Sequence, residues 1–178
     1  MKRYFIYTDA SYSHLDGFGV SGFMVFDGVA AHESGQMSEP GIRNHFFKET
    51  NNIRAEIFGA IHVLNTFITE REKEKVKLSD IEVNLYSDCQ TLTNLLGRRE
   101  KLNTTDYISA RKKTTLPNAD LYKTFFTIYD ELKPVIHWVS GHSKKDGQTL
   151  EQNNFQLIDR QVRKELRILV KKNSPKKT

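Results

Sequence analysis

Four carboxylates lie where predicted strands end or predicted helices begin. Asp9 closes the first predicted strand, and Asp88 closes the fourth. Glu56 and Asp159 lie early in two predicted helices. If the first and fourth strands are neighbours in one sheet, Asp9 and Asp88 meet at one edge. Helices packed on that sheet can bring the other two carboxylates to the same place.

A cluster of this kind is electrostatically costly. Two unit charges about 4 Å apart repel by about 4 kcal/mol at an effective dielectric of 20, so the carboxylates either keep protons or bind cations. Hard oxygen ligands favour Mg²⁺, with Mn²⁺ as an alternative. Two such ions can activate a water and stabilise the leaving oxygen of a phosphodiester without a covalent protein nucleophile. Position alone does not separate this cluster from coincidence, because the chain has 22 acidic residues.

Hydrophobic periodicity predicts the elements that would position these carboxylates. The predicted strands cover residues 3–8, 20–26, part of 30–48, 81–87 and 135–140, and the predicted helices cover 53–68, 90–96, 121–132 and 155–169. Three early strands joined by turns predict an antiparallel meander, and two later strands separated by helices predict parallel additions. We therefore expect an α/β fold with a five-stranded mixed sheet flanked by helices, in one domain over 1–170. A basic, disordered tail is expected at 171–178.

Length and composition place limits on the class of protein. The 178 residues are 38% hydrophobic, and no apolar run reaches the roughly 18 residues of a membrane span. Cys89 is the single cysteine, which excludes an intramolecular disulfide framework and a cysteine-rich zinc site. The basic N-terminus leads into a strand pattern and not into a signal peptide. We expect a cytoplasmic monomer that has no organic cofactor and does not bind a membrane.

The positive charge of the chain is unevenly distributed. The net charge is +5, and the sequence pI is near 9.2. Residues 98–113 hold six Lys or Arg against two acids, and residues 160–178 hold eight against one. Basic clusters neutralise phosphates and release counterions, so nucleic acid is a natural partner. A charge run alone is more often a solvated surface.

Five short segments carry the four carboxylates and a histidine. They are Tyr-Thr-Asp-Ala-Ser at 7–11, Asn-Asn-Ile-Arg-Ala-Glu at 51–56, Tyr-Ser-Asp-Cys-Gln at 86–90, Trp-Val-Ser-Gly-His-Ser at 138–143 and Ile-Asp-Arg-Gln-Val-Arg at 158–163. These segments resemble the type 1 ribonucleases H. The corresponding family motifs are Thr-Asp-Gly-Ser, Thr-Asn-Gln-Arg-Ala-Glu, Thr-Asp-Ser-Gln, Trp-Val-Lys-Gly-His and Ala-Asp-Arg-Leu-Ala-Arg. Each segment alone is weak, but all five come in family order across nearly the whole chain.

The resemblance implies a ribonuclease H-like fold and an endoribonuclease that cuts the RNA strand of RNA–DNA hybrids. The products would carry 5′-phosphate ends. The resemblance also implies a four-carboxylate site in which two metal ions are bound by Asp9, Glu56, Asp88 and Asp159. It makes His142 a loop residue that assists proton transfer or product departure.

The resemblance further implies contacts to the hybrid. Asn52 would contact its minor groove, and Gln90 is a second candidate for such a contact. The basic run that includes Arg111, Lys112 and Lys113 fits a role in gripping the substrate, although residues 98–118 are unlike the family's basic helical protrusion.

The last two segments depart from the family in their spacing. The 17 residues from His142 to Asp159 exceed the usual gap, so residues 144–154 are interpreted as an inserted loop. Asp159 is therefore the least specific match, and Asp146 is the other candidate for a fourth ligand. Asp159 is favoured, because it lies in a helix anchored to the core.

Other features of the sequence allow alternative interpretations. The stretch Gly-Phe-Gly-Val-Ser-Gly at 17–22 matches a dinucleotide fingerprint, but a strand and not a helix follows it, which favours a turn and close packing. Trp138 alternates with Ile136 and is expected in the core, and Cys89 is expected to be a buried hydrophobe.

Two other functions compete with hybrid cleavage. One is a different nuclease or a transposase-like enzyme on the same fold. Related exonucleases resemble Asp-x-Glu on the first strand, whereas Ala10 and Ser11 follow Asp9 here, and integrase-like enzymes place their glutamate late in the chain. The other is a non-catalytic nucleic-acid-binding module, which the presence of all four acids disfavours.

Overall fold

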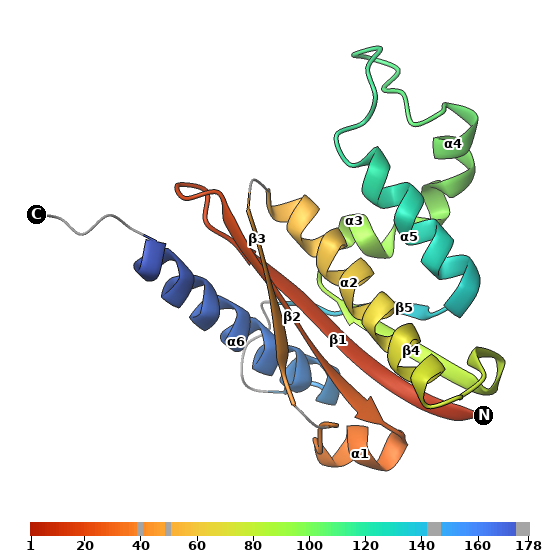
Figure 1. Cartoon of the computed structure of the whole chain (residues 1–178), viewed down its shortest axis with the longest axis vertical. Helices are drawn as coiled ribbons and strands as arrows, with labels where there is room; N and C mark the ends of the chain where they lie inside the picture. Colours follow the sequence, from red (N-terminus) through yellow and green to blue (C-terminus); the bar gives the residue numbers. More distant parts are fainter. Residues whose placement is uncertain (39–40, 49–50, 142–146, 174–178) are drawn as a thin grey trace, which may run out of the picture.

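A computed structural model of the chain describes residues 1–38, 41–48, 51–141 and 147–173. One five-stranded sheet has the order β3-β2-β1-β4-β5 (Figure 1). Its strands are β1 (Lys2–Tyr12), β2 (Phe18–Asp27), β3 (Arg43–Lys48), β4 (Ile81–Ser87) and β5 (Val135–Trp138). The helices are α1 (Val29–Ser34), α2 (Asn52–Lys73), α3 (Gln90–Thr93), α4 (Arg99–Thr104), α5 (Ala119–Leu132) and α6 (Leu150–Asn173), with short 3₁₀ turns η1 (Leu78–Asp80) and η2 (Leu96–Arg98).

The sheet is mixed in the way that the sequence predicts. Strand β1 pairs antiparallel with β2, and β2 pairs antiparallel with β3. Strands β4 and β5 then add in parallel on the other side of β1. This arrangement confirms the prediction of three antiparallel strands followed by two parallel ones, and it makes β1 the central strand.

Helices cover both faces of this sheet, because successive side chains of a strand point to opposite faces. On β1, Ile6 belongs to the core that α2 and α5 cover, whereas its neighbour Tyr7 belongs to the core under α6. Phe125 of α5 and Phe155 of α6 are buried in these two cores. Fully burying a side chain of this size contributes about 1.5–3 kcal/mol, so the two cores hold β1 rigidly between them.

Some element boundaries differ from the predictions. Residues 29–34 form α1, so the strand expected within 30–48 is shortened to 43–48. Helix α6 begins at Leu150, which places part of the expected loop 144–154 in a helix, and it continues to Asn173 through the start of the expected disordered tail. Helix α2 also continues five residues beyond the predicted end at residue 68, because Glu, Arg and Lys at 70–73 favour a helix.

The glycine-rich stretch serves a turn and close packing, as predicted. Gly17 has φ +66 in the β1–β2 turn, and the residues after it form β2 and not a helix. A Cβ at Gly22 would lie 2.7 Å from Val162 Cγ2 and 2.9 Å from Ile158 Cδ1. The absence of a side chain therefore allows α6 to approach β2 closely. Within the described residues, no helix is long and apolar enough to cross a membrane.

Candidate active site

Three of the predicted carboxylates converge near the carboxyl ends of the neighbouring strands β1 and β4. Asp9 lies in β1, Glu56 lies in the second turn of α2, and Asp88 directly follows β4. Their ligand atoms all lie within 4.8 Å of one another. Tyr7 and Tyr86 are partners in the parallel β1–β4 register, so the residues two positions beyond them, Asp9 and Asp88, project at the same edge. We call these three residues the acidic triad.

The start of α2 is built to bring Glu56 into the triad. The Asn51 side chain caps the helix by accepting a hydrogen bond from Arg54 N at 3.0 Å. One turn later, a Cβ at Gly59 would lie 2.7 Å from Ser21 Cβ. Helix α2 therefore lies directly on the sheet, and Glu56 is only 7% exposed.

Burial and mutual repulsion make the triad favour protons or cations. Burial, and then the charges of Asp88 and Asp159, raise the pKa of Asp9 well above its usual range. The pKa of Glu56 is also raised well above its usual range, by burial and then by Asp9 and Asp88. The donor set is all carboxylate oxygen, which fits a hard divalent ion such as Mg²⁺ or Mn²⁺. The triad could therefore hold metal ions.

A family comparison agrees with this fold and this cluster. A model of the RNase H family matches residues 1–167. The chain belongs to the RNase H family. A search of curated protein sequences found no match.

Solved structures of RNase H proteins share the fold. LC11-RNase H1, isolated from compost by a metagenomic approach, is 18% identical over 93% of this chain and 99% of that chain, with a TM-score of 0.59. The PFV RNase H domain is 10% identical over 94% of each chain, with a TM-score of 0.64. LC11-RNase H1 has also been solved in complex with an RNA/DNA hybrid, and that structure is 17% identical over 92% of this chain and 99% of that chain, with a TM-score of 0.57.

The end of β5 and the residues that follow it pack closely against Asp88 in this RNase H chain. A Cβ at Gly141 would overlap Asp88 Oδ2, so a larger residue at this position would have to displace the Asp88 carboxylate. Trp138 Nε1 donates to the Asp88 backbone oxygen at 3.2 Å. The neighbouring Cys89 is buried, as expected, and burial raises the pKa of its thiol to about 11, which leaves the thiol protonated and unreactive.

Trp138 corrects a prediction. The strand pattern predicts a core side chain at this position, but Trp138 is 53% exposed. Strand β5 is a short edge strand that ends at Trp138, and Val135 at its other end is 48% exposed. The alternation with Ile136 is correct, but the edge position of β5 leaves the Trp138 side chain exposed.

The fourth predicted carboxylate, Asp159, stands in different surroundings. It lies near the triad, because its charge contributes to the raised pKa of Asp9 and of Glu56. Its carboxylate is half-buried, and Oδ1 lies 2.7 Å from Arg163 Nε one helical turn away. It is not among the ligand atoms that lie within 4.8 Å of one another. The sequence analysis missed this ion pair. His142 and Asp146 fall outside the described residues.

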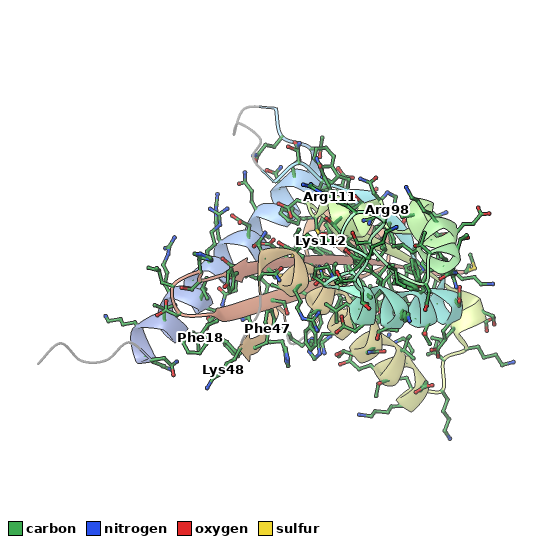
Figure 2. All side chains as sticks on the ribbon, turned by 90° about the horizontal axis from the view of Figure 1, so that it is seen from above. Phe18, Phe47, Lys48, Arg98, Arg111 and Lys112 are labelled. Carbon is green, nitrogen blue, oxygen red and sulfur yellow. The ribbon has the colours of Figure 1, made fainter. Side chains whose placement is uncertain are left out.

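The predicted nucleic-acid contacts are all exposed side chains. Asn52 and Gln90 are exposed at the first residues of α2 and α3. Arg111, Lys112 and Lys113 are exposed in the loop between α4 and α5, and Figure 1 shows this loop projecting beyond the sheet. Figure 2 shows Arg111 and Lys112 on the same side of the molecule as Arg98.

This projecting segment, residues 98–118, has a defined shape that the sequence did not predict. Helix α4 is tied to α5 by Arg99 Nη1, which lies 2.6 Å from Asp130 Oδ1. The loop then closes on itself through an antiparallel bridge between Ile108 and Thr115. A short helix and a closed loop therefore make up this segment.

Proposed function

We propose that this protein is an endoribonuclease that hydrolyses the RNA strand of RNA–DNA hybrids and leaves 5′-phosphate ends. The observation that carries the proposal is the buried acidic triad, whose ligand atoms lie within 4.8 Å of one another in a chain of the RNase H family. The hybrid bound in the structure of LC11-RNase H1 supports the choice of substrate. The cytoplasmic location and the monomeric state remain predictions.

The triad residues would act as the metal-binding part of the site. Two Mg²⁺ ions, or Mn²⁺, would supply an activated water and stabilisation of the leaving oxygen when bound. Asp9, Glu56 and Asp88 would hold them, because their ligand atoms lie within 4.8 Å of one another and the pKa values of Asp9 and Glu56 are raised. The two cores under β1 fix the positions of these carboxylates, and productive metal geometry needs such rigidity.

Two further residues complete the proposed chemistry. We assign Asp159 as the fourth ligand, because α6 carries it close enough to the triad to raise the pKa of Asp9. We assign His142 as the residue that moves a proton or assists product departure, on the resemblance of the segment at 138–143 to the family's histidine loop. A general acid or base typically contributes about 10²–10⁴-fold to the rate.

Recognition of the hybrid would combine groove and backbone contacts. A protein distinguishes RNA from DNA in a minor groove through the 2′-OH. Asn52 lies four residues before Glu56, and Gln90 lies two residues after Asp88, so both amides are exposed beside the triad. The basic segment with Arg111 would neutralise backbone phosphates.

Cleavage of labelled duplexes tests the proposal. RNA–DNA, RNA–RNA and DNA–DNA duplexes of one sequence are incubated with the protein, with Mg²⁺ or with a chelator. We expect cleavage of the hybrid only, on its RNA strand and only with the metal. Equal cutting of the DNA–DNA duplex would overturn the proposed specificity. Hybrid binding without cleavage would indicate a non-catalytic binding protein.

A further inference from the structure

Helix α6 carries a continuous row of basic side chains on the face that points away from the sheet. The row, which we call the α6 stripe, consists of Arg160, Arg163, Lys164, Arg167 and Lys171, all exposed. These residues recur at three- and four-residue steps, so they share one face of the helix. The opposite face holds the buried Phe155, Ile158 and Val162. At a rise of about 1.5 Å per residue the stripe is roughly 16 Å long.

No acidic side chain interrupts this face. The other outward residues near the stripe, Gln156, Leu157 and Ile168, are neutral. Among the described residues, the only salt bridge that the stripe makes is the one from Arg163 to Asp159. Glu165 lies half-buried at the side of the helix, where its Oε1 accepts a hydrogen bond from Gln161 Nε2 at 2.9 Å. Four of the five cations are therefore without a carboxylate partner in the described part of the chain.

The exposed face of α5 shows what a solvated helix face looks like in the same molecule. It carries both signs of charge, and its acids bind basic side chains of neighbouring helices. Asp120 Oδ1 lies 2.9 Å from Arg54 Nη1 of α2, and Asp130 Oδ1 lies 2.6 Å from Arg99 Nη1 of α4. Those charges help to assemble the fold. The α6 stripe makes no comparable contact between elements in the described part of the chain.

The stripe is also unfavourable for the helix that carries it. Like charges four residues apart on a helix destabilise it. Three pairs in the stripe have this spacing, namely Arg160 with Lys164, Arg163 with Arg167, and Arg167 with Lys171. The stripe destabilises its own helix and, in the described part of the chain, forms no salt bridge to another element, so an anionic partner explains it best. A nucleic-acid strand carries one phosphate per about 3.4 Å of helix axis, so the stripe matches the length of about five phosphate steps.

The position of the stripe relative to the triad identifies the partner. Gly22, the partner of Asp9 in the β1–β2 register, lies against Ile158 and Val162 of α6, so the stripe begins beside the candidate active site. From there α6 runs away from α4 and the loop that follows it, and Figure 1 shows the two basic segments on opposite sides of the central strands. A duplex held over the triad can therefore meet basic side chains on both sides.

We propose that the α6 stripe is a second phosphate-binding surface for the hybrid, engaging its backbone beyond the cleavage site on the side away from residues 98–113. This inference rests on the function proposed above. It predicts that long hybrids are bound more tightly than short ones, because only a long duplex reaches both basic surfaces.

The test uses a fourfold variant, Arg160→Gln, Lys164→Gln, Arg167→Gln and Lys171→Gln, which leaves the Arg163–Asp159 pair in place. A charge-matched control replaces four other exposed lysines, Lys73, Lys75, Lys77 and Lys133, with Gln. Both sets are also placed in an Asp88→Asn background, so that binding is measured without cleavage. Circular dichroism and melting confirm that each variant is folded.

Binding to labelled hybrids is measured by fluorescence anisotropy over a range of salt concentrations. For a hybrid of about 24 base pairs, we expect the stripe variant to bind at least about tenfold more weakly than the wild type. The slope of log K against log salt should flatten by about 0.9 for each phosphate that the variant no longer neutralises. The control should keep the wild-type slope. Binding of a hybrid of about 8 base pairs should change little, because that duplex is too short to reach both surfaces. Neutralising Arg111, Lys112 and Lys113 together should flatten the slope further.

The outcomes separate this inference from the proposed activity. An unchanged affinity and slope for the long hybrid would overturn the α6 surface, as would an equal loss of affinity in the charge-matched control. With the catalytic aspartate intact, we expect the stripe variant to raise KM for the long hybrid and to leave kcat unchanged. If the wild-type protein cuts no hybrid but the stripe variant still weakens binding selectively, the α6 surface is retained and the proposed activity fails.

Discussion

The acidic triad and Asp159 carry the same charge in one small region, but the fold treats them differently. Asp9 is 5% exposed and Glu56 7%, and both have a raised pKa. Asp159 is half-buried and lies 2.7 Å from Arg163. Neighbouring carboxylates raise the pKa of Asp9 and of Glu56, whereas Asp159 forms an ion pair with Arg163.

This difference indicates two kinds of carboxylate in the site. A cluster with unrelieved repulsion binds either protons or a metal ion, so the triad is organised around a ligand. An exposed ion pair one helical turn apart contributes little to stability. Arg163 instead occupies the Asp159 carboxylate, and Asp159 would contribute to metal binding only to the extent that this ion pair opens.

Removing one triad charge should have the largest effect. We expect Asp9→Asn to reduce hybrid cleavage to the limit of detection while the fold stays intact, because a central metal ligand is removed. Initial rates with Mg²⁺ and a far-ultraviolet circular dichroism spectrum measure this. The exposed Asp80→Asn serves as a control with the same chemical change. Retention of more than a few per cent of activity would place the metal site elsewhere.

The loss of Asp159 should be smaller but clear. We expect Asp159→Asn to lower Mg²⁺-dependent cleavage by about ten- to a hundredfold, the range seen when a residue that supports a metal site is removed. Asp146→Asn should be nearly silent, because the sequence predicts a loop there and a loop holds a ligand poorly. The reverse result would mean that the loop supplies the fourth ligand.

The meeting of Asp9 and Asp88 could be predicted because parallel register is a property of the backbone, although β1 continues past the predicted strand end at Asp9 to Tyr12. Once β1 and β4 pair, Asp9 and Asp88 have to project at one edge. The partner of Asp159 could not be predicted in the same way. Arg163 is a flexible side chain on a half-exposed helix, and the Asp-Arg spacing of four residues is common on any helix.

The sequence also did not predict the exposure of Trp138, the presence of α1 or the shape of residues 98–118, which depend on the surroundings of each element. Trp138 follows the alternation of its strand, but its exposure depends on the edge position of β5. Helix α1 begins after Gly28 and ends at Gly35, both at positive φ, in a stretch that has no apolar period of its own. The shape of residues 98–118 depends on contacts with α5 and not on local propensity.

Charge repulsion in the triad should also make the metal-free protein less stable as the pH rises. The pKa values of Asp9 and Glu56 are raised above those near 4 in an unfolded chain. The folded state therefore binds more protons than the unfolded state. The resulting stabilisation is present below the unfolded pKa and is lost as the pH rises through the folded pKa. With a chelator present, Tm should fall between about pH 5 and about pH 8 more in the wild type than in Asp9→Asn. A difference on the order of 1 kcal/mol shifts Tm by roughly 2–4 °C in a domain of this size. Equal pH dependence in the two proteins would show that the pKa of Asp9 is not raised.

The smallest effect should come from Arg163, and it tests the comparison most directly. Arg163 lowers the pKa of Asp9 and occupies the carboxylate of Asp159. Arg163→Gln removes a positive charge near the triad and frees Asp159, so a divalent cation should bind more tightly. Calorimetric titration with Mn²⁺ in the absence of nucleic acid measures this without any contribution from nucleic-acid binding to the α6 stripe. We expect a several-fold lower Kd, since a nearby charge contributes on the order of 1 kcal/mol in a solvated site. Asp159→Asn combined with Arg163→Gln should remove most of the gain. A weaker Mn²⁺ affinity in Arg163→Gln would instead mean that the arginine positions Asp159 as a ligand, and the two kinds of carboxylate would then form one cluster.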